Sequence, residues 1–176
     1  MTEKISSIGI VKESRLDESR APIAPNQVSE IIKKYPDINI VVQPCNKRTF
    51  KNEEYERCGA KILEDLSNCD ILFGVKEVDT NKLIPNKEYV FFSHTYKLNK
   101  ETLSNAQGTP GMDKKELLKS ILNKKIKLID YENIRDANGA RYLGFGRFAG
   151  IVGCYNTLNL FLSQNNFQPL ARAYKI

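Results

Sequence analysis

The sequence predicts an α/β fold with three layers, in which a mostly parallel sheet is covered by helices on both faces. Two observations favour this class. Short apolar runs with the length of buried strands recur along the chain, and helical segments separate the first of them in the order strand, helix, strand, helix, strand. Ionisable residues follow several of these runs, as expected where parallel strands end at one shared edge.

The first part of the chain holds two strand–helix pairs. Residues 7–11 (SIGIV) and 39–43 (NIVVQ) are compact apolar runs typical of buried strands. Between them, Pro25 suits the first turn of a helix, and the following apolar residues fall on one helical face: Val28, Ile31, Ile32 and Tyr35. A short second helix is predicted over 52–58, opened by Asn52 and closed by Gly59.

The later part continues the alternation. Strands are predicted over 61–63, 70–75, 88–93 and 127–129. An apolar stripe predicts a helix before the last strand, formed by Leu117, Leu118, Ile121 and Leu122. Glycine and proline make 102–112 a loop. The pattern over 148–162 predicts one long, buried helix, in which Val152→Asp is expected to unfold the domain.

Composition indicates an ordinary globular protein and excludes several function classes. A chain of 176 residues with 41% hydrophobic and 27% charged content suits one domain. No apolar run reaches the roughly 20 residues of a membrane span, and the N-terminus lacks a signal-peptide core, so we expect a cytoplasmic protein without a membrane partner. The net charge of +6 is mixed with acids and accompanies no nucleic-acid module, so no nucleic-acid partner is expected. Four dispersed cysteines and one histidine make a metal site improbable.

The candidate site is organised around residues 71–97, where two predicted strands each end in ionisable residues. The first delivers Lys76 and Glu77, and the second delivers His94, the only histidine, and Lys97. If both strands are parallel, these residues share the crevice in which open α/β sheets bind ligands. A lysine–histidine pair there suits proton transfer. The alternative is that Lys76 and Glu77 merely solvate a strand end and that His94 is a hydrogen-bonded partner of a carbonyl group.

Two further features concern ligand binding: a pair of arginines and a cluster of glycines. Arg15 and Arg20 follow the first strand, and arginine binds carboxylates in a fixed plane, so an amino-acid or dicarboxylic-acid substrate is expected. Residues 144–150 (GFGRFAG) contain the G-x-G of a dinucleotide site. No acid-bearing strand follows at the required spacing, so these glycines are interpreted as allowing close packing of the long helix.

With these residues placed, the sequence resembles the N-terminal domain of the alanine dehydrogenase, transhydrogenase and saccharopine dehydrogenase group. Shared segments run in the family's order: VKESRLDESRAPIAP, VVQPCNKRTF, GVKE, FFSHTYK, LIDYE and GFGRFAG. The combination of FFSHTYK, LIDYE and GFGRFAG is most similar to the lysine branch, saccharopine dehydrogenase and lysine–2-oxoglutarate reductase. The resemblance implies a Rossmann-like, flavodoxin-like substrate domain.

The resemblance also implies residue roles in an NAD(P)-dependent oxidoreductase acting on CH–NH donors, which interconverts saccharopine with lysine and 2-oxoglutarate. Lys76 corresponds to the base for the amine proton, and His94 to the acid–base group of imine formation or hydrolysis. The residues that correspond to the substrate pocket are Arg15, Arg20, Glu77, Lys97 and Glu132. Arg141 is expected to approach the cofactor, NAD or NADP.

Two departures accompany the resemblance. The 102–112 loop is longer than the family pattern, and the family's nucleotide-binding domain is absent from these 176 residues. The chain is therefore expected to be inactive alone and to work with a missing domain or partner chain. An alanine dehydrogenase-like domain, or a non-catalytic amino-acid-binding module, remains the alternative.

Overall fold

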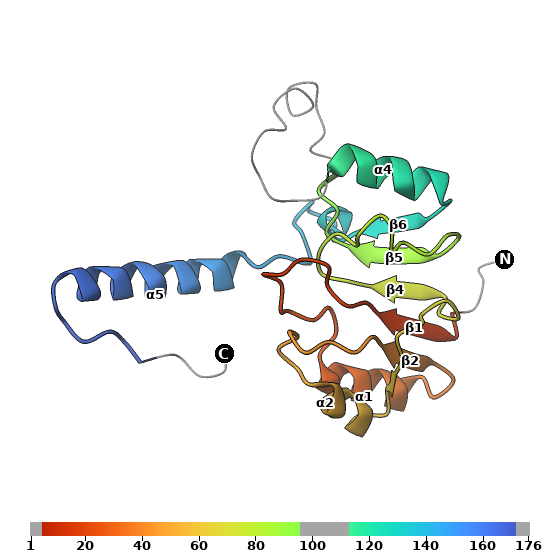
Figure 1. The fold of residues 1–176 in the computed structure, drawn as a ribbon, viewed down its shortest axis with the longest axis horizontal. Helices are drawn as coiled ribbons and strands as arrows, with labels where there is room; N and C mark the ends of the chain where they lie inside the picture. Colours follow the sequence, from red (N-terminus) through yellow and green to blue (C-terminus); the bar gives the residue numbers. More distant parts are fainter. Residues whose placement is uncertain (1–4, 96–112, 172–176) are drawn as a thin grey trace. The chain divides into compact units, whose positions relative to one another are not determined.

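The computed structural model describes residues 5–95 and 113–171 (Figure 1). The chain divides into two compact units, Met1–Ile134 and Arg135–Ile176, and each is considered by itself. The predicted loop over 102–112 and the candidate residue Lys97 lie outside the described residues.

The first unit is built on a six-stranded sheet in the order β3-β2-β1-β4-β5-β6, and every neighbouring pair is parallel (Figure 1). Its strands are β1 (Ser7–Ile10), β2 (Asn39–Val42), β3 (Lys61–Ile62), β4 (Ile71–Phe73), β5 (Glu88–Phe91) and β6 (Lys127–Asp130). The chain adds strands to one side of β1 up to β3, and then crosses to add β4, β5 and β6 on the other side. The order of strands therefore reverses between β1 and β4.

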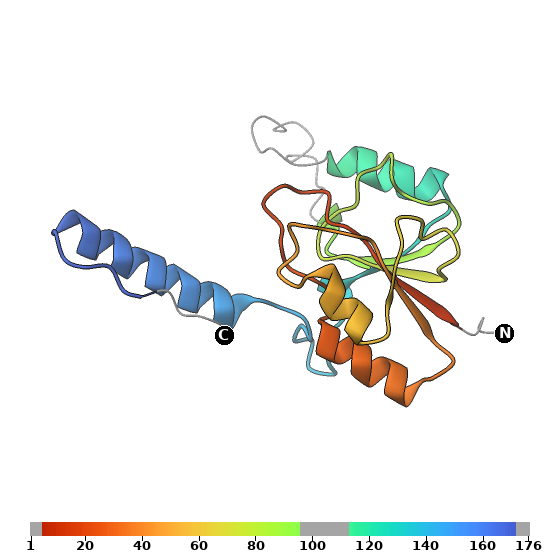
Figure 2. The same cartoon turned by 60° about the horizontal axis from the view of Figure 1, so that its bottom comes forward.

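Helices cover both faces of this sheet, which confirms the predicted three layers (Figure 2). On one face, α1 (Pro25–Lys34) and α2 (Asn52–Arg57) contribute Val28 and Tyr55 to a core cluster that contains Ile8 and Ile10. On the other face, α4 (Lys114–Asn123) contributes Leu117 and Ile121 to a cluster with residues of the neighbouring strands, Leu72, Tyr89 and Phe91.

The helix starts follow from local hydrogen bonds. In α1, Pro25 is the first residue, and the Gln27 side chain accepts a hydrogen bond from the Ala24 amide at 2.8 Å. Asn52 begins α2 but is not its cap, because its Oδ1 accepts from the Cys45 amide at 3.1 Å and holds the preceding loop. Gly59 ends this helix as predicted, with a φ of 94° that favours glycine.

The second unit contains a turn and one long helix. Residues Arg135 and Arg141 form an antiparallel bridge around a turn at Gly139, whose φ is 79°. The helix α5 (Gly146–Gln164) matches the prediction in position but not in burial, because none of its residues is buried. Phe148, for example, is 52% exposed. Apolar spacing predicts a helix, but it does not say which surface covers the apolar side chains.

The exposure of α5 changes the expectation for Val152→Asp. Val152 is 55% exposed, so the prediction that this substitution unfolds the domain is wrong. An exposed substitution usually changes the free energy of unfolding by no more than about 0.5 kcal/mol. Urea denaturation of the variant is expected to give the wild-type midpoint; a loss of several kcal/mol would show that the side chain is buried.

Gly9 and Gly150 provide a matched pair of glycine tests. An added Cβ at Gly9 would lie 2.4 Å from Leu72 Cδ2 and 3.2 Å from Cys69 Sγ, whereas at Gly150 nothing lies within 4 Å. Gly9→Ala is therefore expected to destabilise the first unit by about 1–3 kcal/mol through overpacking. Gly150→Ala is expected to stabilise α5 by up to about 1 kcal/mol. Thermal unfolding checks both, and an unchanged Gly9→Ala melt would contradict the packing described.

Candidate active site at the carboxyl edge of the sheet

The carboxyl ends of β1 and β4 lie side by side at the point where the strand order reverses, which is where open α/β sheets generally bind ligands. The strand pair is extended by a hydrogen bond from the Val11 amide to the Phe73 carbonyl, at 2.9 Å. The next residue, Gly74, is required by close packing, because an added Cβ would lie 2.9 Å from Val11 Cγ2. The loops after the two strands therefore leave the sheet in contact.

Lys76 and His94 follow adjacent parallel strands, β4 and β5. The segments that carry them are joined directly, since the Phe92 amide donates to the Val75 carbonyl at 3.1 Å. Lys76 also approaches the loop after β1. The pKa of Asp17 is lowered to about 2, first by its hydrogen bond from Arg15, and the charge of Lys76 contributes in the same direction. The structure thus brings the loops carrying Arg15, Lys76 and His94 to one edge.

His94 has an unusual backbone conformation. Its φ is 55°, in the left-handed region that side chains other than glycine rarely adopt. A hydrogen bond from the Thr95 amide to Ser93 Oγ, at 3.1 Å, spans the residue and holds this turn. Ser93 is fully buried and donates a short hydrogen bond to Asp130, the last residue of β6. Strain that the surroundings maintain is typical of functional positions.

Glu132 lies beside the imidazole. His94 Nδ1 and Glu132 Oε2 are 3.1 Å apart, within ion-pair distance, although the atoms lack the alignment of a hydrogen bond. Glu132 is 2% exposed and is anchored through its backbone amide, which donates to Asp130 Oδ1 at 2.9 Å. The contact becomes an ion pair when the imidazole is protonated. Glu132 is therefore placed to orient the imidazole ring.

Each of the two arginines is paired with an acid two residues away. Arg15 binds Asp17 through Nε and Nη2, at 2.9 and 2.7 Å, and Arg20 binds Glu18 in the same manner, at 2.8 and 2.5 Å. The Arg15 and Arg20 side chains remain 39% and 42% exposed. These pairs fix the planes of the guanidinium groups without burying them.

Two buried carboxylates complete the edge. Glu77 is 8% exposed, and its Oε2 has no hydrogen-bond partner among the described residues. Its charge acts on Arg15, whose pKa is raised first by the hydrogen bond to Asp17 and also by the charge of Glu77. Glu13 is 7% exposed and accepts hydrogen bonds from the amides of Val75, at 2.6 Å, and Lys76, at 3.0 Å. The sequence analysis missed Glu13. Its only signal was an acid directly after an apolar strand.

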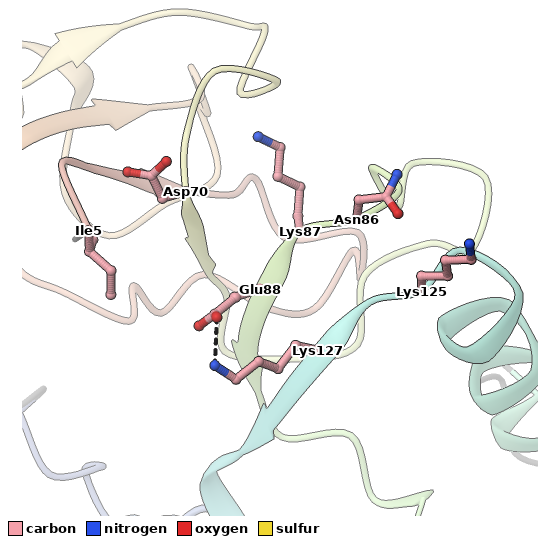
Figure 3. Close-up of a pocket in the computed structure, with 7 residues that line it drawn as sticks. All are labelled: Ile5, Asp70, Asn86, Lys87, Glu88, Lys125 and Lys127. Carbon is pink, nitrogen blue, oxygen red and sulfur yellow. Dashed lines mark hydrogen bonds and ion pairs between the residues drawn. The ribbon is translucent and has the colours of Figure 1, made fainter. Parts of the chain in front are cut away.

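Some predicted contributions are not placed at this edge. Lys97 lies outside the described residues, and Arg141 belongs to the second unit, so both remain predictions. A cavity of about 290 Å³ lies instead at the amino ends of β4, β5 and β6, lined among others by Asp70, Lys87 and Lys127 (Figure 3). Glu88 and Lys127 pair there at 2.6 Å. We place the candidate site at the carboxyl edge because the strained histidine and the buried carboxylates lie there.

Neither a metal nor a dinucleotide finds a ready site in the described part of the chain. Within residues 5–95 and 113–171, no three His, Cys, Asp or Glu side chains are grouped to hold a metal ion. The glycines of 144–150 lie before and within α5, and no parallel strand of the described chain leads into them. They therefore lack the strand, glycine turn and helix that hold a pyrophosphate. In the same residues, no helix is long and apolar enough to cross a membrane.

The parallel sheet and its reversal between β1 and β4 define an open α/β domain of the class that binds ligands at the carboxyl edge. The chain belongs to the family described as alanine dehydrogenase/PNT, N-terminal domain, whose model matches residues 9–152. The predicted family resemblance is confirmed.

Relatives from lysine metabolism share this region. Alpha-aminoadipic semialdehyde synthase from Rattus norvegicus is 36% identical over 142 residues, which cover 81% of this chain and 14% of that protein. Saccharopine dehydrogenase [NAD(+), L-lysine-forming] from Candida glabrata is 30% identical over 147 residues, or 80% of this chain and 36% of that protein. The chain therefore spans well under half the length of these relatives.

Solved structures support the fold. An L-alanine dehydrogenase matches 76% of this chain and 34% of its own with a TM-score of 0.58 at 16% identity. A transhydrogenase from Sinorhizobium meliloti matches 74% of this chain and 36% of its own with a TM-score of 0.55 at 14% identity. At these identities the likeness shows the fold alone.

The left-handed conformation of His94 predicts how glycine and alanine at this position affect the free energy of unfolding. Because glycine adopts this conformation without steric cost, His94→Gly is expected to be more stable than His94→Ala by about 1 kcal/mol. At an ordinary backbone position the order is reversed, since glycine loses more conformational entropy on folding. Paired urea titrations measure the difference. A more stable alanine variant would show that residue 94 is not left-handed in solution.

Proposed function

We propose that this chain is the substrate-binding and catalytic domain of an NAD(P)-dependent amino-acid oxidoreductase that interconverts saccharopine with lysine and 2-oxoglutarate. The observation that carries the proposal is the convergence of Lys76 and His94 on one edge of the sheet, beside the loop that holds Arg15 and Arg20. The printed activities of the lysine-metabolism relatives support this substrate class.

The carboxylates of the substrate would be bound by the basic side chains of the loop after β1. Saccharopine carries several carboxylates, and a guanidinium group matches a carboxylate with two parallel hydrogen bonds. Arg15 and Arg20 are exposed enough to meet a ligand, and Asp17 and Glu18 hold their planes. Lys97 is proposed as a third carboxylate contact. Because exposed ion pairs contribute little free energy, a substrate carboxylate could compete with exposed Asp17 for Arg15. At Arg20, whose partner Glu18 is buried, it would bind the exposed part of the guanidinium group.

Lys76 and His94 would then move protons at different steps. Lys76 would act as the base for the proton that the secondary amine of saccharopine loses when that nitrogen becomes an imine. The imidazole of His94 would take a proton from the water that attacks the imine and return it to the departing lysine nitrogen. Glu132, 3.1 Å from Nδ1, would favour the imidazolium formed between these transfers, and buried Glu77 would adjust the charge near Lys76.

The cofactor would be held elsewhere. A nicotinamide cofactor, NAD or NADP, would supply the hydride chemistry when bound, but the described residues do not fit its pyrophosphate. We therefore propose that its main anchor is a nucleotide-binding domain, or a partner chain, outside these 176 residues, and that Arg141 gives at most an accessory contact. A cytoplasmic location also remains a prediction. The chain alone is expected to bind substrate but not to turn it over.

Calorimetric titration of the purified chain tests this division of roles. Saccharopine is expected to bind more tightly than L-alanine or pyruvate, and NADH or NADPH is expected to show no micromolar affinity. Arg20→Ala is expected to weaken saccharopine binding by roughly tenfold or more, because it removes a hydrogen bond to a charged group. Lys33→Ala, on an exposed part of α1, is the matched control and is expected to bind like wild type.

The same titration separates the alternatives. Preference for L-alanine or pyruvate would favour an alanine dehydrogenase-like domain. In the intact enzyme, Lys76→Met is expected to lower kcat by about 10²–10⁴-fold, as for other general acid–base groups. Unchanged kcat in that variant would indicate a binding module without a proton-transfer role for Lys76.

A further inference from the structure

The segment that carries Lys76 is held by side chains of the loop after β1. The Glu13 carboxylate accepts hydrogen bonds from the amides of Val75 and Lys76, at 2.6 and 3.0 Å. Next to it, Ser14 Oγ accepts from the Asp79 amide at 3.1 Å. These amides lie past the end of β4, where no neighbouring strand pairs with them. The Glu13 side chain therefore accepts the hydrogen bonds that a neighbouring strand would otherwise accept, and it does so at Lys76, the proposed base.

Glu13 occupies an environment that disfavours its charge. It is 7% exposed, and burial raises the pKa of its carboxyl above the ordinary value, while the two amide hydrogen bonds oppose this shift. Two more charged groups act on it: the charge of Glu18 raises the pKa, and that of Arg48 lowers it. The hydrogen bonds and Arg48 are thus what favours the ionised form.

Arg48 is itself buried and incompletely bonded. It is 6% exposed, its Nη2 donates to the Gln43 carbonyl at 3.1 Å, and its guanidinium lies 5.4 Å from the centre of the Tyr55 ring. Its Nη1 is buried without a hydrogen-bond partner in the described chain. A buried charge is costly unless an opposite charge compensates for it, and Glu13 is a buried opposite charge whose pKa responds to it.

The opposite edge of the same strand pair provides an internal comparison. Asp70, just before β4, accepts hydrogen bonds from the amides of Ser6 and Ser7, at 2.8 and 2.9 Å. The pKa of Asp70 is lowered, first by the Ser6 amide and then by further bonds from both serines, whereas that of Glu13 is raised. Both carboxylates clamp β1 to β4. At Glu13 desolvation outweighs the hydrogen bonds, whereas at Asp70 the hydrogen bonds outweigh desolvation, and only Glu13 holds the Lys76 segment.

We propose that Glu13 is the positioning residue of Lys76, through the hydrogen bonds that its carboxylate accepts from the amides of Val75 and Lys76. The inference rests on the proposed function in one respect, namely that Lys76 contacts the substrate. Glu13 touches no substrate itself; it acts by fixing the backbone from which the lysine side chain extends.

A double-mutant cycle tests this coupling. Glu13→Gln is expected to weaken saccharopine binding to the purified chain by roughly five- to tenfold, and to add nothing in a Lys76→Met background, because coupled sites are not additive. Asp70→Asn removes the matching clamp at the other edge and is expected to leave binding as in wild type. Additive losses in the cycle, or an equal loss in Asp70→Asn, would overturn the assignment and indicate a general structural role.

Two measurements that need no substrate test the role of Glu13 even if the purified chain does not bind saccharopine. The amide proton signals of Val75 and Lys76 in nuclear magnetic resonance spectra are expected to titrate together, with a midpoint above the ordinary 4.5 of a glutamate, and to lose this titration in Glu13→Gln. Arg48→Met is expected to move the midpoint further up, and Arg48→Lys to restore it in part. Amides that do not titrate would overturn the proposal even where saccharopine binds.

The pH dependence of the free energy of unfolding provides an independent test of the Glu13 carboxylate. Because the pKa of Glu13 is raised on folding, the unfolded chain releases this proton at lower pH than the folded chain. The contribution of Glu13 to stability therefore falls as pH rises from about 4.5 through the folded pKa. Glu13→Gln is expected to lose this decrease, so that its free energy of unfolding changes less than that of wild type as pH rises from about 4.5 to 7. A variant that keeps the wild-type decrease would contradict the proposal.

Discussion

The parallel pairing of β1 with β4 is the constraint on which the rest of the first unit depends. The chain reaches β1 first, builds outward to β3, and must return across β1 to start the second half of the sheet. Gly9 allows this contact, because Leu72, Cys69 and Leu66 leave no room for a Cβ at its position. Carboxylates hold the pair at both ends, Asp70 at the amino edge and Glu13 at the carboxyl edge. The loops after the two strands must therefore meet at one edge.

The electrostatics of that edge follow from short-range pairing. The protein carries a net charge of +6, yet the basic groups proposed to meet the substrate each have an acid beside them: Arg15 has Asp17, Arg20 has Glu18, and His94 has Glu132. The arginine side chains are partly exposed, and their acids fix the planes of the guanidinium groups. Glu18 and Glu132, the acids beside Arg20 and His94, are buried, whereas Asp17 beside Arg15 is exposed.

The fold could largely be predicted from the sequence because its signals are local. Apolar runs, a proline at Pro25 and a glycine at Gly59 mark the elements, and the alternation of strands and helices implies the parallel sheet. The same logic predicts that Lys76 and His94 follow neighbouring strands, and the structure has them after β4 and β5; that they form a functional site stays a prediction. The exposure of α5 could not be predicted, because burial depends on which surface covers a helix.

The contacts that support the candidate site could not be predicted from the sequence either. Glu13 accepts hydrogen bonds from amides that lie 62 and 63 residues further along the chain, and hydrophobic periodicity does not reveal such contacts. The left-handed residue His94 directly follows Ser93, whose hydrogen bond to Asp130 links the ends of two neighbouring strands. Such features arise only once the register of the sheet is fixed. They are the features that convert nearby ionisable residues into a specific arrangement.

The central claim is that Lys76 and His94 act on one substrate at the carboxyl edge of the sheet. A crystal structure of the chain with saccharopine tests it most directly. The account predicts that the ligand lies in the crevice between the loops after β1, β4 and β5, with its secondary amine within reach of both side chains. Saccharopine bound instead at the amino edge, in the cavity beside Lys87, or lysine and histidine side chains too far apart to contact one ligand, would contradict it.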